Sequence, residues 1–389
     1  MDRITKKIDF SEAYDTASLK GKSVLVTGGA AGIGQGSVVG FAEAGAHVTI
    51  ADINEKEAEE TVQELTSKGH HAQFIKTDVS SWDSLVAAFN AAVAFSPDNT
   101  VDIVVPAAGI SNGGIRNWLD ETPLDEAGNP KPLPTKVMDI NLDAVFTTTH
   151  LALYYFKKNP GPNIEVPKQI IFVASMGGYS SMTGVLDYCT SKWAVRGMFR
   201  SLRGAYEILG EGKPKIRCNL IAPTYVKTAM TKTYWEYMEK MGVYMAEVSD
   251  CTDVVLRMAA DENVIGTFSA SPFPCDHSLI SFLSFTGRSA CIARNRTSFD
   301  LCDDAEGSDG GREVREGAKK LYGGEFLKRV TSKTEAVAKE GDIEKAEELA
   351  KEVEASKGAS VSSSEVPEGI EDFGLGGAGA KKVNGVAAA

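Results

Sequence analysis

Between residues 23 and 221, short apolar runs alternate with helical stretches of roughly ten to fifteen residues. Regular alternation of this kind predicts βαβ units and a parallel sheet. Runs that are apolar throughout also fit strands buried on both faces. We therefore expect an α/β fold with a doubly wound parallel sheet. The expected strands lie in residues 22–29, 47–52, 72–78, 101–109, 169–175 and 215–223, and the main expected helices in residues 32–43, 54–68, 82–94, 136–159 and 187–209.

The composition changes along the 389 residues, a length that exceeds a typical domain of ~100–200 residues. Residues 331–389 contain one aromatic residue, Phe373, and their last part is rich in Gly, Ser and Ala, which is typical of disorder. We expect a polar lead-in over residues 1–20, one α/β domain over residues 21–330, and a helical or low-complexity tail over residues 331–389.

The charge balance excludes several classes of protein. Lys and Arg total 41 against 53 Asp and Glu, so the net charge is −12, which is unsuited to general nucleic-acid or anionic-lipid binding. No apolar run approaches the ~18 residues of a membrane span, and the first ten residues lack the apolar core of a signal peptide. Six scattered cysteines without a CxxC pair are typical of a reducing compartment. We therefore expect a cytoplasmic protein without nucleic-acid or membrane partners.

A cluster of glycines follows the first expected strand and opens the first expected helix, in the segment TGGAAGIG from Thr27 to Gly34. Glycines here allow a tight turn and the close approach of a pyrophosphate, to which the helix N-terminus offers unpaired N–H groups. The alternative is that they serve only the sterics of an ordinary strand-to-helix turn. Their position after the first strand favours phosphate binding.

Asp52 ends the second expected strand, 18 residues after Gly34. A carboxylate at this place hydrogen-bonds the adenosine ribose hydroxyls and repels a 2′-phosphate. The nearest basic residue in the sequence is Lys56, so we predict NAD rather than NADP as the cofactor. The alternative is an aspartate that only caps the next helix.

Tyr188 and Lys192 are four residues apart at the start of an expected helix, which places both on one face. A free tyrosine titrates near ~10, and a neighbouring ammonium lowers this pKa because it stabilises the phenolate. Tyr188 would then serve as a general base toward a hydroxyl group. In isolation, such a pair is more often a surface or packing pair. Ser175 ends the fifth expected strand at the same sheet edge, 13 residues before the tyrosine.

Taken together, these motifs resemble the classical short-chain dehydrogenase/reductase family over roughly residues 20–265. The glycine pattern is the family's TGxxxGxG and excludes the extended, epimerase-like branch, which has TGxxGxxG. The resemblance extends to the YxxxK motif, the catalytic serine, the helix asparagine, the adenine-side aspartate and the NxIxPGxVxT segment. The matching residues are Thr27, Gly28, Gly32 and Gly34; Tyr188 and Lys192; Ser175; Asn141; Asp78; and Asn219, Pro223, Val226 and Thr228.

The resemblance implies a Rossmann fold and a metal-free hydride transfer between a carbinol carbon and NAD. It implies that Ser175 binds the substrate oxygen and that Lys192 binds the nicotinamide ribose and tunes Tyr188. It also implies a water on Asn141 that relays protons, and a grip on the nicotinamide carboxamide by Thr228 and the Val226 backbone. The implied catalytic residues are Asn141, Ser175, Tyr188 and Lys192, and the implied cofactor contacts are Thr27, Gly28, Gly32, Ile33, Gly34, Asp52, Asp78, Val79, Ala108, Gly109, Tyr188, Lys192, Pro223, Val226 and Thr228.

Two positions depart from the family pattern. The family's NNAG segment is PAAG here, from Pro106 to Gly109, and a proline cannot form the hydrogen bonds with which the first asparagine braces the sheet. The family's Pro-Gly is Pro223-Thr224, and a β-branched threonine is stiffer than glycine. Because the four catalytic positions are intact, we interpret both departures as variants that keep function.

Residues 225–244, which cover the substrate in this family, are rich in Tyr, Trp and Met. Such a surface suits a bulky apolar alcohol or ketone of lipid, steroid or polyketide type better than a sugar. In this respect the chain is similar to NAD-linked 15-hydroxyprostaglandin dehydrogenases and fungal secondary-alcohol dehydrogenases. The alternative is a helix that packs on the core or on a partner subunit. The family also pairs through two long helices, so the resemblance implies a homodimer or homotetramer built on residues 136–159 and 187–209.

The segment Thr267–Gly287 is unlike both of its flanks, and its removal would join VIG directly to a strand-like RSACIARN. Its 21 residues correspond to 63 nucleotides, and its ends can be encoded with GT at the start and AG at the finish. We weigh a retained short intron against a genuine lineage-specific loop. Both hypotheses stay open at this point.

These observations predict an NAD-dependent oxidoreductase that interconverts a bulky apolar secondary alcohol and its ketone, with Tyr188 as general acid/base. A non-catalytic NAD-binding sensor or scaffold is one alternative, since a fold does not fix function; the intact catalytic residues count against it. A methyltransferase that binds an adenosyl cofactor at the glycine turn is another, but it would leave Tyr188 and Lys192 without a role. We predict no metal, since the sequence shows no His, Cys and carboxylate cluster with ligand spacing.

Overall fold

The computed structural model describes residues 13–111, 122–179, 185–240, 245–264, 268–270 and 299–300. All of them belong to the first of two compact units, which runs from Met1 to Asp342. The expected tail over residues 331–389 and most of Thr267–Gly287 lie outside the described residues, so the expectations for them stay predictions.

Within the described residues, eight strands form one sheet in the order β3-β2-β1-β4-β5-β6-β7-β9. Neighbours pair in parallel from β3 to β7, and β9 joins the edge in the antiparallel sense. The chain order reverses at β1, which lies between β2 and β4. The doubly wound sheet predicted from the sequence is therefore confirmed. The strands are β1 Ser23–Thr27, β2 His47–Asp52, β3 His71–Lys76, β4 Ile103–Pro106, β5 Lys168–Val173, β6 Ile216–Ala222, β7 Phe268–Ala270 and β9 Phe299–Asp300.

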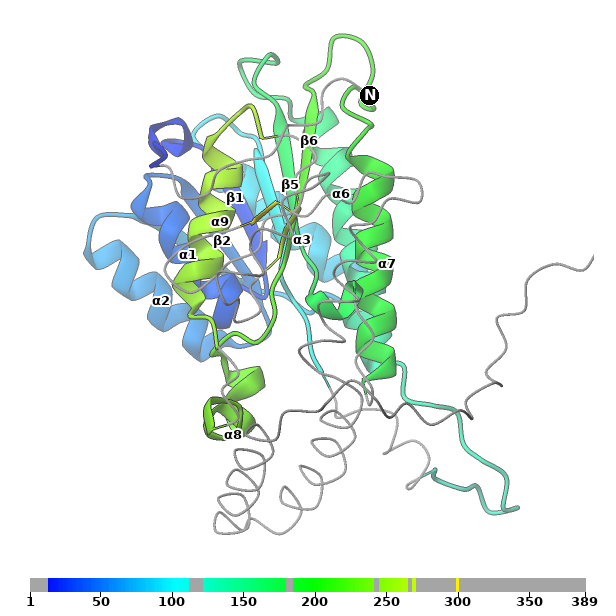
Figure 1. Ribbon diagram of the computed structural model, residues 1–389. Coiled ribbons are helices and arrows are strands. Elements are labelled where there is room, and N and C mark those ends of the chain that lie inside the picture. The colour runs from blue at the N-terminus through cyan, green and yellow to red at the C-terminus, as the bar shows by residue number, and fades with distance from the viewer. Residues whose placement is uncertain are drawn as a thin grey trace, which may run out of the picture. The chain divides into compact units, whose positions relative to one another are not determined.

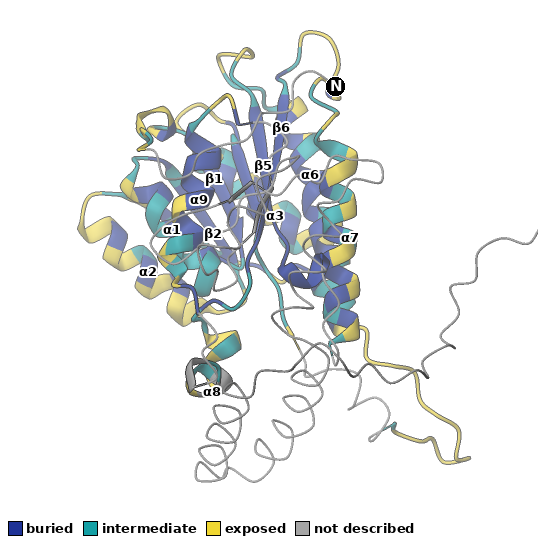
Figure 2. Cartoon of the chain, in the orientation of Figure 1, coloured by how far each residue is buried: buried dark blue, intermediate teal, exposed yellow. Residues whose placement is uncertain are grey.

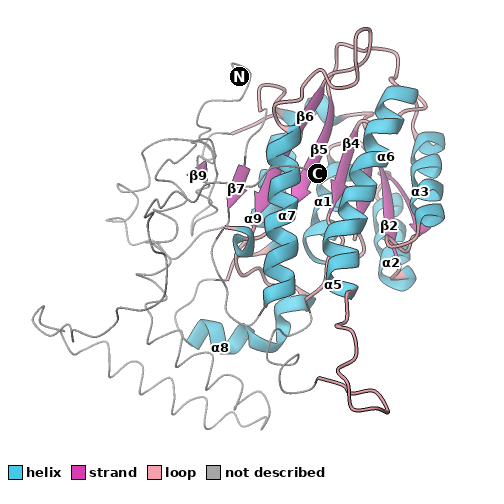
Figure 3. Ribbon diagram, turned by 90° about the vertical axis from the view of Figure 1, so that its right-hand side faces the viewer, coloured by secondary structure: helices cyan, strands magenta, loops and turns pink. Residues whose placement is uncertain are grey.

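Helices cover both faces of this sheet, as Figure 1 and Figure 3 show. The helices α1, α2 and α9 lie on one face, and α3, α6 and α7 lie on the other. No helix among the described residues is long and apolar enough to cross a bilayer. The α-helices are α1 Gly32–Glu43, α2 Glu55–Ser67, α3 Trp82–Phe95, α5 Lys136–Met138, α6 Ala144–Lys158, α7 Leu186–Leu202, α8 Trp235–Lys240 and α9 Val248–Ala260.

The two faces of the sheet form two separate apolar cores, because successive side chains of a strand point to opposite faces. Val24 and Val26 of β1 join the core under α1 and α9, whereas Leu25 between them joins the core under α3, α6 and α7. Figure 2 shows the strands as the buried centre between helices with exposed outer faces. Burial on both faces explains why the strands are apolar throughout.

Two helices differ from the sequence-based expectation. The helix expected over residues 136–159 contains a π-helical segment, η2 Asp139–Asp143, between α5 and α6. The helix expected over residues 187–209 ends at Leu202 and is followed by turns. Gly204, two residues after this end, is a poor helix former, and Ala205 N–H bonds the Leu202 carbonyl in a tighter turn.

The lead-in is anchored to the domain at its end. Ala17–Leu19 form a short 3-10 helix, and the Leu19 side chain is buried in the core under α1 and α9. The Ser18 hydroxyl donates to the carbonyl of Ala260, the last residue of α9, over 2.8 Å. These contacts hold the first described turn of the chain against the α9 layer.

The seventh strand comes from the segment that the sequence marked as unusual. Phe268 pairs with Leu220 of β6, and Ala270 pairs with Ala222. The strand-like segment RSACIARN, residues 288–295, lies outside the described residues. The retained-intron hypothesis stays a prediction, and sequencing the mature transcript across Thr267–Gly287 tests it. Continuous coding sequence there would contradict the hypothesis.

Candidate active site

The carboxyl edge of the sheet collects most of the residues that the sequence singled out. The glycine turn follows β1, Asp52 ends β2, and the segments after β4, β5 and β6 leave the sheet at the same edge. The start of α7 reaches this edge too, since Lys192 contacts the last residue of β5. In doubly wound sheets, ligands bind beyond this edge where the strand order reverses.

Two glycines of the turn are required by packing. Gly28 has φ +68°, and a Cβ on it would lie 2.6 Å from the Ala108 Cα. A Cβ on Gly34 would collide with the Gly28 carbonyl oxygen. The steric explanation weighed above therefore accounts for part of the glycine pattern. Thr27 is buried beside them, and its carbonyl accepts the Ala107 N–H over 3.1 Å.

The N-terminus of α1 is open to an anion. Its N-cap residue, Ala31, makes no side-chain capping bond, and the first turn carries no acidic residue. Gly32 has φ +54°, and a Cβ on it would lie 3.1 Å from the Thr228 Cγ2. Unpaired N–H groups and the helix dipole favour a negative ligand here. This part of the site fits the pyrophosphate of a dinucleotide, with Thr228 beside it.

Asp52 joins the end of β2 to the glycine turn. One carboxylate oxygen accepts the Ala30 N–H over 3.0 Å, and the other accepts the Asn54 N–H over 2.9 Å. The N-cap residue of α2 is Asn54, so the capping role considered for Asp52 does not apply. The carboxylate therefore lies beside the turn, at the place where the sequence expects the adenosine ribose.

A basic residue that the sequence analysis missed lies next to this carboxylate. Lys76, the last residue of β3, is the register partner of Asp52. Its ammonium pairs with Glu55 over 3.0 Å, and both side chains are more than half exposed. The neighbourhood of the expected ribose thus holds two carboxylates and one ammonium. The pairing of β2 with β3 places Lys76 there, although 24 residues separate it from Asp52 in the sequence.

Asp78 forms the turn between β3 and α3. Its Oδ1 accepts the Ser80 N–H over 2.9 Å and the Ser80 hydroxyl over 2.6 Å, and these bonds lower the pKa of Asp78. Its own N–H bonds the Ser84 hydroxyl. Val79 beside it is buried in the core under α3. These contacts give Asp78 a structural role, and its adenine contact stays a prediction.

Asn141 lies in the π-helical segment and is fully buried. Its Oδ1 accepts the Ile110 N–H over 2.8 Å, and its Nδ2 donates to the Ile110 carbonyl over 2.9 Å. The Nδ2 also approaches the Ser191 hydroxyl at 3.3 Å. Asn141 therefore fixes the chain after β4 to α7. A π-helical segment at such a place is typical of functional sites.

Lys192 is buried at the centre of these contacts. Its ammonium donates to the Val173 carbonyl over 3.0 Å and lies 5.7 Å from the centre of the Tyr188 ring. A Cβ on Gly109 would lie 3.7 Å from this nitrogen and 3.3 Å from the Asn141 Oδ1. Burial lowers the pKa of Lys192 to about 8. The structure thus brings Tyr188, Lys192, Asn141 and Gly109 together.

Ser175 follows β5 and caps a short 3-10 helix, η3 Met176–Gly178. Its hydroxyl accepts the Gly177 N–H over 3.1 Å and donates to the Pro223 carbonyl at 3.4 Å. The same carbonyl accepts the Met176 N–H over 2.9 Å. Pro223 therefore contributes to the site through its backbone, which joins the segment after β6 to the catalytic serine.

Pro106 occupies the last position of β4, where it pairs with Thr27 of β1. The pairing of β4 with β5 stops earlier, at Val104 and Ile170. The missing N–H therefore falls at the end of the strand, where proline is tolerated best. This placement is consistent with the interpretation of PAAG as a variant.

The aromatic and Met-rich region is divided between core and surface. Met245 is buried, Trp235 and Met238 are half-buried, and Met230 is exposed. Val226 at its start is buried and forms a β-bridge with Ala246. Residues 241–244 and the Tyr234 and Tyr237 side chains lie outside the described part. At Met245, the alternative of a packing role describes the structure better than a substrate contact.

Comparison with known proteins identifies this arrangement. The short chain dehydrogenase family matches residues 22–239, more than half of the chain. The chain belongs to this family. Its 5'-hydroxyaverantin dehydrogenase relative from Dothistroma septosporum is 37% identical over 77% of this chain and 93% of the relative. The NADP-dependent dehydrogenase M3 from Phoma sp. is 30% identical over 80% of this chain and 88% of the relative.

Solved structures of the family share the fold. A short-chain type dehydrogenase/reductase from Mycobacterium marinum superposes with a TM-score of 0.52 at 25% identity, covering 63% of this chain and 91% of that chain. The resemblance to the short-chain dehydrogenases and the Rossmann fold are thereby confirmed. The chain is an oxidoreductase of this family, whose fold binds a nicotinamide dinucleotide.

Three residues of this short-chain dehydrogenase were not singled out from its sequence. Ile110 and Ser191 hold Asn141, and Thr231 bonds the segment after β6 to Trp235. Ser191 lies inside the YxxxK motif, so its position carried a signal. Ile110 acts through its backbone and Thr231 through a tertiary contact, and neither feature has a sequence pattern.

The described cysteines of this dehydrogenase are buried thiols. Burial raises the pKa of Cys218 to about 12 and also raises the pKa of Cys251. A thiol with such a pKa is neither a good nucleophile nor a good metal ligand. Among the described residues, no group of three His, Cys, Asp or Glu side chains could hold a metal ion.

Proposed function

We propose that the protein is an NAD-dependent dehydrogenase that interconverts a bulky apolar secondary alcohol and its ketone, with Tyr188 as general acid/base. The observation that carries the proposal is the buried Lys192 ammonium beside Tyr188, Asn141 and Gly109. A cation this deep is unfavourable unless a ligand or a reacting group uses it, and such groups are candidates for catalytic function.

Each residue then has a defined task. Tyr188 takes the proton of the substrate hydroxyl, and the nearby Lys192 ammonium stabilises the phenolate that makes this transfer possible at neutral pH. When the alcohol binds, Ser175 turns its one hydroxyl hydrogen from the Pro223 carbonyl, 3.4 Å away, to the substrate oxygen, while the Gly177 N–H holds the hydroxyl oxygen in place. When bound, the nicotinamide dinucleotide supplies the hydride acceptor.

The cofactor preference rests on Asp52. Its carboxylate lies beside the glycine turn, and Glu55 adds a second negative charge close to it. The Lys76 ammonium favours a 2′-phosphate, but Glu55 pairs with it. One net negative charge therefore remains, which disfavours the phosphate of NADP. The name of the Phoma relative shows that NADP is used within the family, so this preference requires a direct test.

The substrate class rests on the residues beside the site. Trp235 and Met238 are half-buried in the segment after Thr228, and such side chains favour large apolar molecules. The relative named 5'-hydroxyaverantin dehydrogenase supports an alcohol as the reacting group.

The decisive experiment measures NADH formation by the purified full chain over a panel of bulky secondary alcohols, including 3-hydroxysteroids. Tyr188→Phe should abolish turnover, because it removes the hydroxyl that takes the proton. Tyr154→Phe is the matched control, since Tyr154 is exposed on α6, and it should leave turnover unchanged. Tight NADH binding without turnover by the wild type would contradict the proposal and support a sensor.

The cofactor test compares NAD and NADP on the same alcohol. Asp52→Asn should lower the preference for NAD by at least about tenfold, since each tenfold change corresponds to ~1.4 kcal/mol and the change removes a whole charge beside the ribose. Glu60→Gln, on the exposed part of α2, removes an equal charge as a control. Equal use of NAD and NADP by the wild type would contradict the NAD assignment.

We further propose that two copies pair through the outer faces of α6 and α7. Phe146 and Tyr154 of α6 are more than half exposed, and Leu186 and Trp193 of α7 are exposed by 49% and 44%. Large apolar side chains gathered on adjacent helices mark an interaction surface. Light scattering should give a multiple of the 41.5 kDa chain mass, and Phe146→Glu should reduce it to one chain. A monomeric wild type would contradict this proposal.

A further inference from the structure

The turn that carries Ser175 rests directly on the helix that carries Tyr188 and Lys192. This turn, η3 Met176–Gly178, is buried. A Cβ on Gly178 would lie 2.7 Å from the Lys192 carbonyl oxygen, so the backbone of the turn touches the backbone of α7. The position of the Ser175 hydroxyl relative to Tyr188 therefore depends on how the turn is held against α7.

Backbone bonds connect the end of this turn to the serine. The Gly178 N–H donates to the Ser175 carbonyl over 2.8 Å, and the Tyr179 N–H donates to the Met176 carbonyl over 2.9 Å. Between them, the Gly177 N–H donates to the Ser175 hydroxyl over 3.1 Å. A shift at the end of the turn therefore moves the N–H group that holds the serine hydroxyl.

Arg196 of α7 holds the end of the turn from the side of the helix. Its Nη1 donates to the Gly178 carbonyl over 3.2 Å, and its guanidinium carbon lies 3.9 Å from the centre of the buried Tyr179 ring. The centre of the Trp193 ring lies 5.0 Å from the same carbon. A planar guanidinium can stack on aromatic rings and donate a hydrogen bond at the same time. Arg196 follows Lys192 by four residues, so both lie on one face of α7.

The start of the turn is attached to a different part of the site. The Met176 N–H donates to the Pro223 carbonyl over 2.9 Å, which ties the turn to the segment after β6. The contacts of Arg196 tie the turn to α7 instead. Arg196 therefore acts on the placement of Ser175 relative to the helix that carries Tyr188.

We propose that Arg196 is a positioning residue, which sets the placement of the Ser175 hydroxyl relative to Tyr188 through the turn Met176–Gly178. This inference rests on the proposed function, in which Ser175 binds the substrate oxygen and Tyr188 takes its proton. Both side chains must reach the same oxygen atom, so a small displacement of one relative to the other lowers turnover. The binding of the cofactor does not depend on this alignment.

The test compares the wild type, Arg196→Met and Arg196→Lys in steady-state NADH formation, using the full chain and the best alcohol of the panel above. Arg196→Met keeps most of the side-chain volume but loses the donor and the charge, and kcat should fall about tenfold. Arg196→Lys keeps a charge and a donor, and kcat should return to within about threefold of the wild type. The KM for NAD should stay within about twofold in both variants.

Arg200→Met is the matched control, since it changes an exposed arginine one turn further along α7, and it should behave as the wild type. All proteins are compared at a temperature at which thermal unfolding shows them to be folded.

The Ser175→Ala background separates a positioning role from a purely structural one. In that background Arg196→Met should lower kcat by less than about twofold, because the hydroxyl that Arg196 positions is already absent. A general loss of packing would lower kcat by the same factor in both backgrounds. Single-turnover measurements with enzyme in excess over NAD give the rate where turnover is slow.

The possible results distinguish this inference from the function on which it rests. A wild type without turnover on any alcohol of the panel would overturn the proposed function. If the wild type turns over and Arg196→Met keeps its full kcat, the role of Arg196 alone is overturned. An equal loss of kcat in the wild-type and Ser175→Ala backgrounds would overturn it as well.

Discussion

A buried lysine lies at each end of β5: Lys168 is the first residue of the strand, and Lys192 of α7 contacts its last residue, Val173. The two lysines have different surroundings. At the amino end, the Lys168 ammonium contacts Asp102 over 2.7 Å and the Thr100 hydroxyl over 2.5 Å. At the carboxyl end, Lys192 donates to the Val173 carbonyl over 3.0 Å, and no described carboxylate pairs with it. A neutralised cation, Lys168, therefore lies at the amino end of β5, and an unneutralised cation, Lys192, lies at its carboxyl end.

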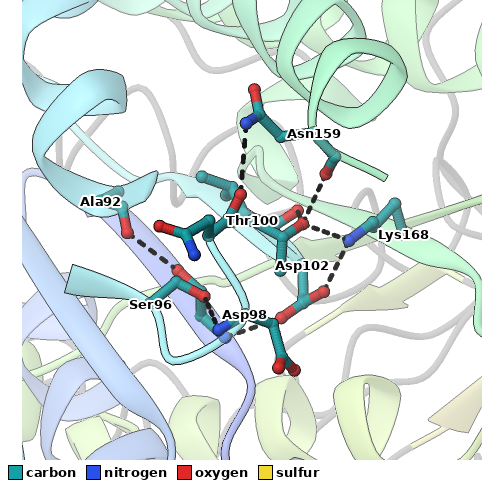
Figure 4. A network of polar contacts seen from close by, with 10 residues as sticks. Ala92, Ser96, Asp98, Thr100, Asp102, Asn159 and Lys168 are labelled. Carbon is teal, nitrogen blue, oxygen red and sulfur yellow. Dashed lines mark hydrogen bonds and ion pairs between the residues drawn. The ribbon is translucent and has the colours of Figure 1, made fainter. Parts of the chain in front are cut away.

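Partnered polar groups surround Lys168 at the amino edge. Figure 4 shows Lys168 pointing toward Thr100 and Asp102. The Thr100 hydroxyl in turn donates a hydrogen bond to the Asn159 carbonyl at the end of α6, over 2.6 Å. Nearby, Arg217 is buried and its guanidinium donates to carbonyls at the end of α9, a favourable place for a cation. The contacts of Lys168 and Arg217 thus link the ends of α6 and α9 to the sheet.

The reactive charge of this fold therefore lies at the carboxyl edge of the sheet, at Lys192. A buried ion pair whose partners are complete does little beyond fixing geometry, whereas a buried cation without a counter-ion raises the free energy of the folded chain. Such a group persists at a functional site, where its charge acts on a ligand or a neighbouring side chain. The comparison predicts that the amino-edge lysine serves stability and the carboxyl-edge lysine serves turnover.

The largest expected effect separates the two lysines by activity. Lys192→Met should lower turnover by about 10²- to 10⁴-fold, the range for loss of a positioned acid–base group. Lys168→Met should leave turnover per folded molecule within about threefold, because it lies at the opposite edge. Steady-state NADH formation at a temperature where both variants are folded checks this. Comparable losses of turnover in both variants would contradict the separate roles of the two lysines.

The free energy of unfolding should show the reverse order, with the larger loss at Lys168. Lys168→Met leaves Asp102 buried without its cation, so we expect a loss of about 3–5 kcal/mol in the free energy of unfolding. The double variant Lys168→Met/Asp102→Asn should recover most of this loss, because the amide keeps an acceptor for the Ser23 N–H, which now bonds Asp102 over 2.8 Å. Urea unfolding of both variants measures the difference. A stable Lys168→Met single variant would show that the pair is dispensable.

The stability of the folded chain should depend on pH through Lys192. Burial lowers its pKa from 10.5 to about 8 in the folded chain. Between pH 8 and pH 10.5 the unfolded chain binds more protons than the folded chain, so the free energy of unfolding rises with pH. The full cost of burying the charged ammonium is present only below pH 8. Relative to Lys192→Met, the wild type should gain about 2 kcal/mol between pH 7.5 and pH 9.5. If urea unfolding gave the same change in the free energy of unfolding for both proteins across this range, the unpaired state of Lys192 would be contradicted.

Much of the fold could be predicted from the sequence because its pattern is local. The apolar runs mark β1 to β6, and Gly45 and Gly69, both with positive φ, follow the ends of α1 and α2. The π-helical segment around Asn141 was not predicted, since it coincides with tertiary contacts of Asn141 with Ile110 and Ser191 that have no local sequence pattern. The end of α7 at Leu202 was also missed, although Gly204 within the expected range is a poor helix former.

The candidate site was predicted to a similar degree. Motif spacing places Tyr188 and Lys192 on one helix face, and the ends of the parallel strands place Ser175 near Pro223. Lys76 was missed, since only the pairing of β2 with β3 brings it beside Asp52. Which buried charge lacks a partner was also beyond the sequence, because the Lys168–Asp102 contact is tertiary and joins residues 66 positions apart.

The smallest expected effect concerns an exception at the amino edge. His47 and His71 begin β2 and β3 and stack with ring centres 4.2 Å apart, and the His47 Nδ1 is buried without a hydrogen-bond partner. Burial and, to a lesser degree, His71 lower the pKa of His47 below 6.5. The unfolded chain therefore binds this proton more readily, and stability is lost as the pH falls through about 6.5.

His47→Gln should reduce this loss of stability, whereas His70→Gln, at a histidine that lies outside the stack, should not. The difference between pH 7.5 and pH 5 should stay below about 1 kcal/mol, because the ring is partly exposed and solvent screens its charge. Thermal unfolding at the two pH values measures it. A larger effect would mean that the amino edge also holds a charge-sensitive group, and that complete partnering is a property of the Lys168 cluster rather than of the whole edge.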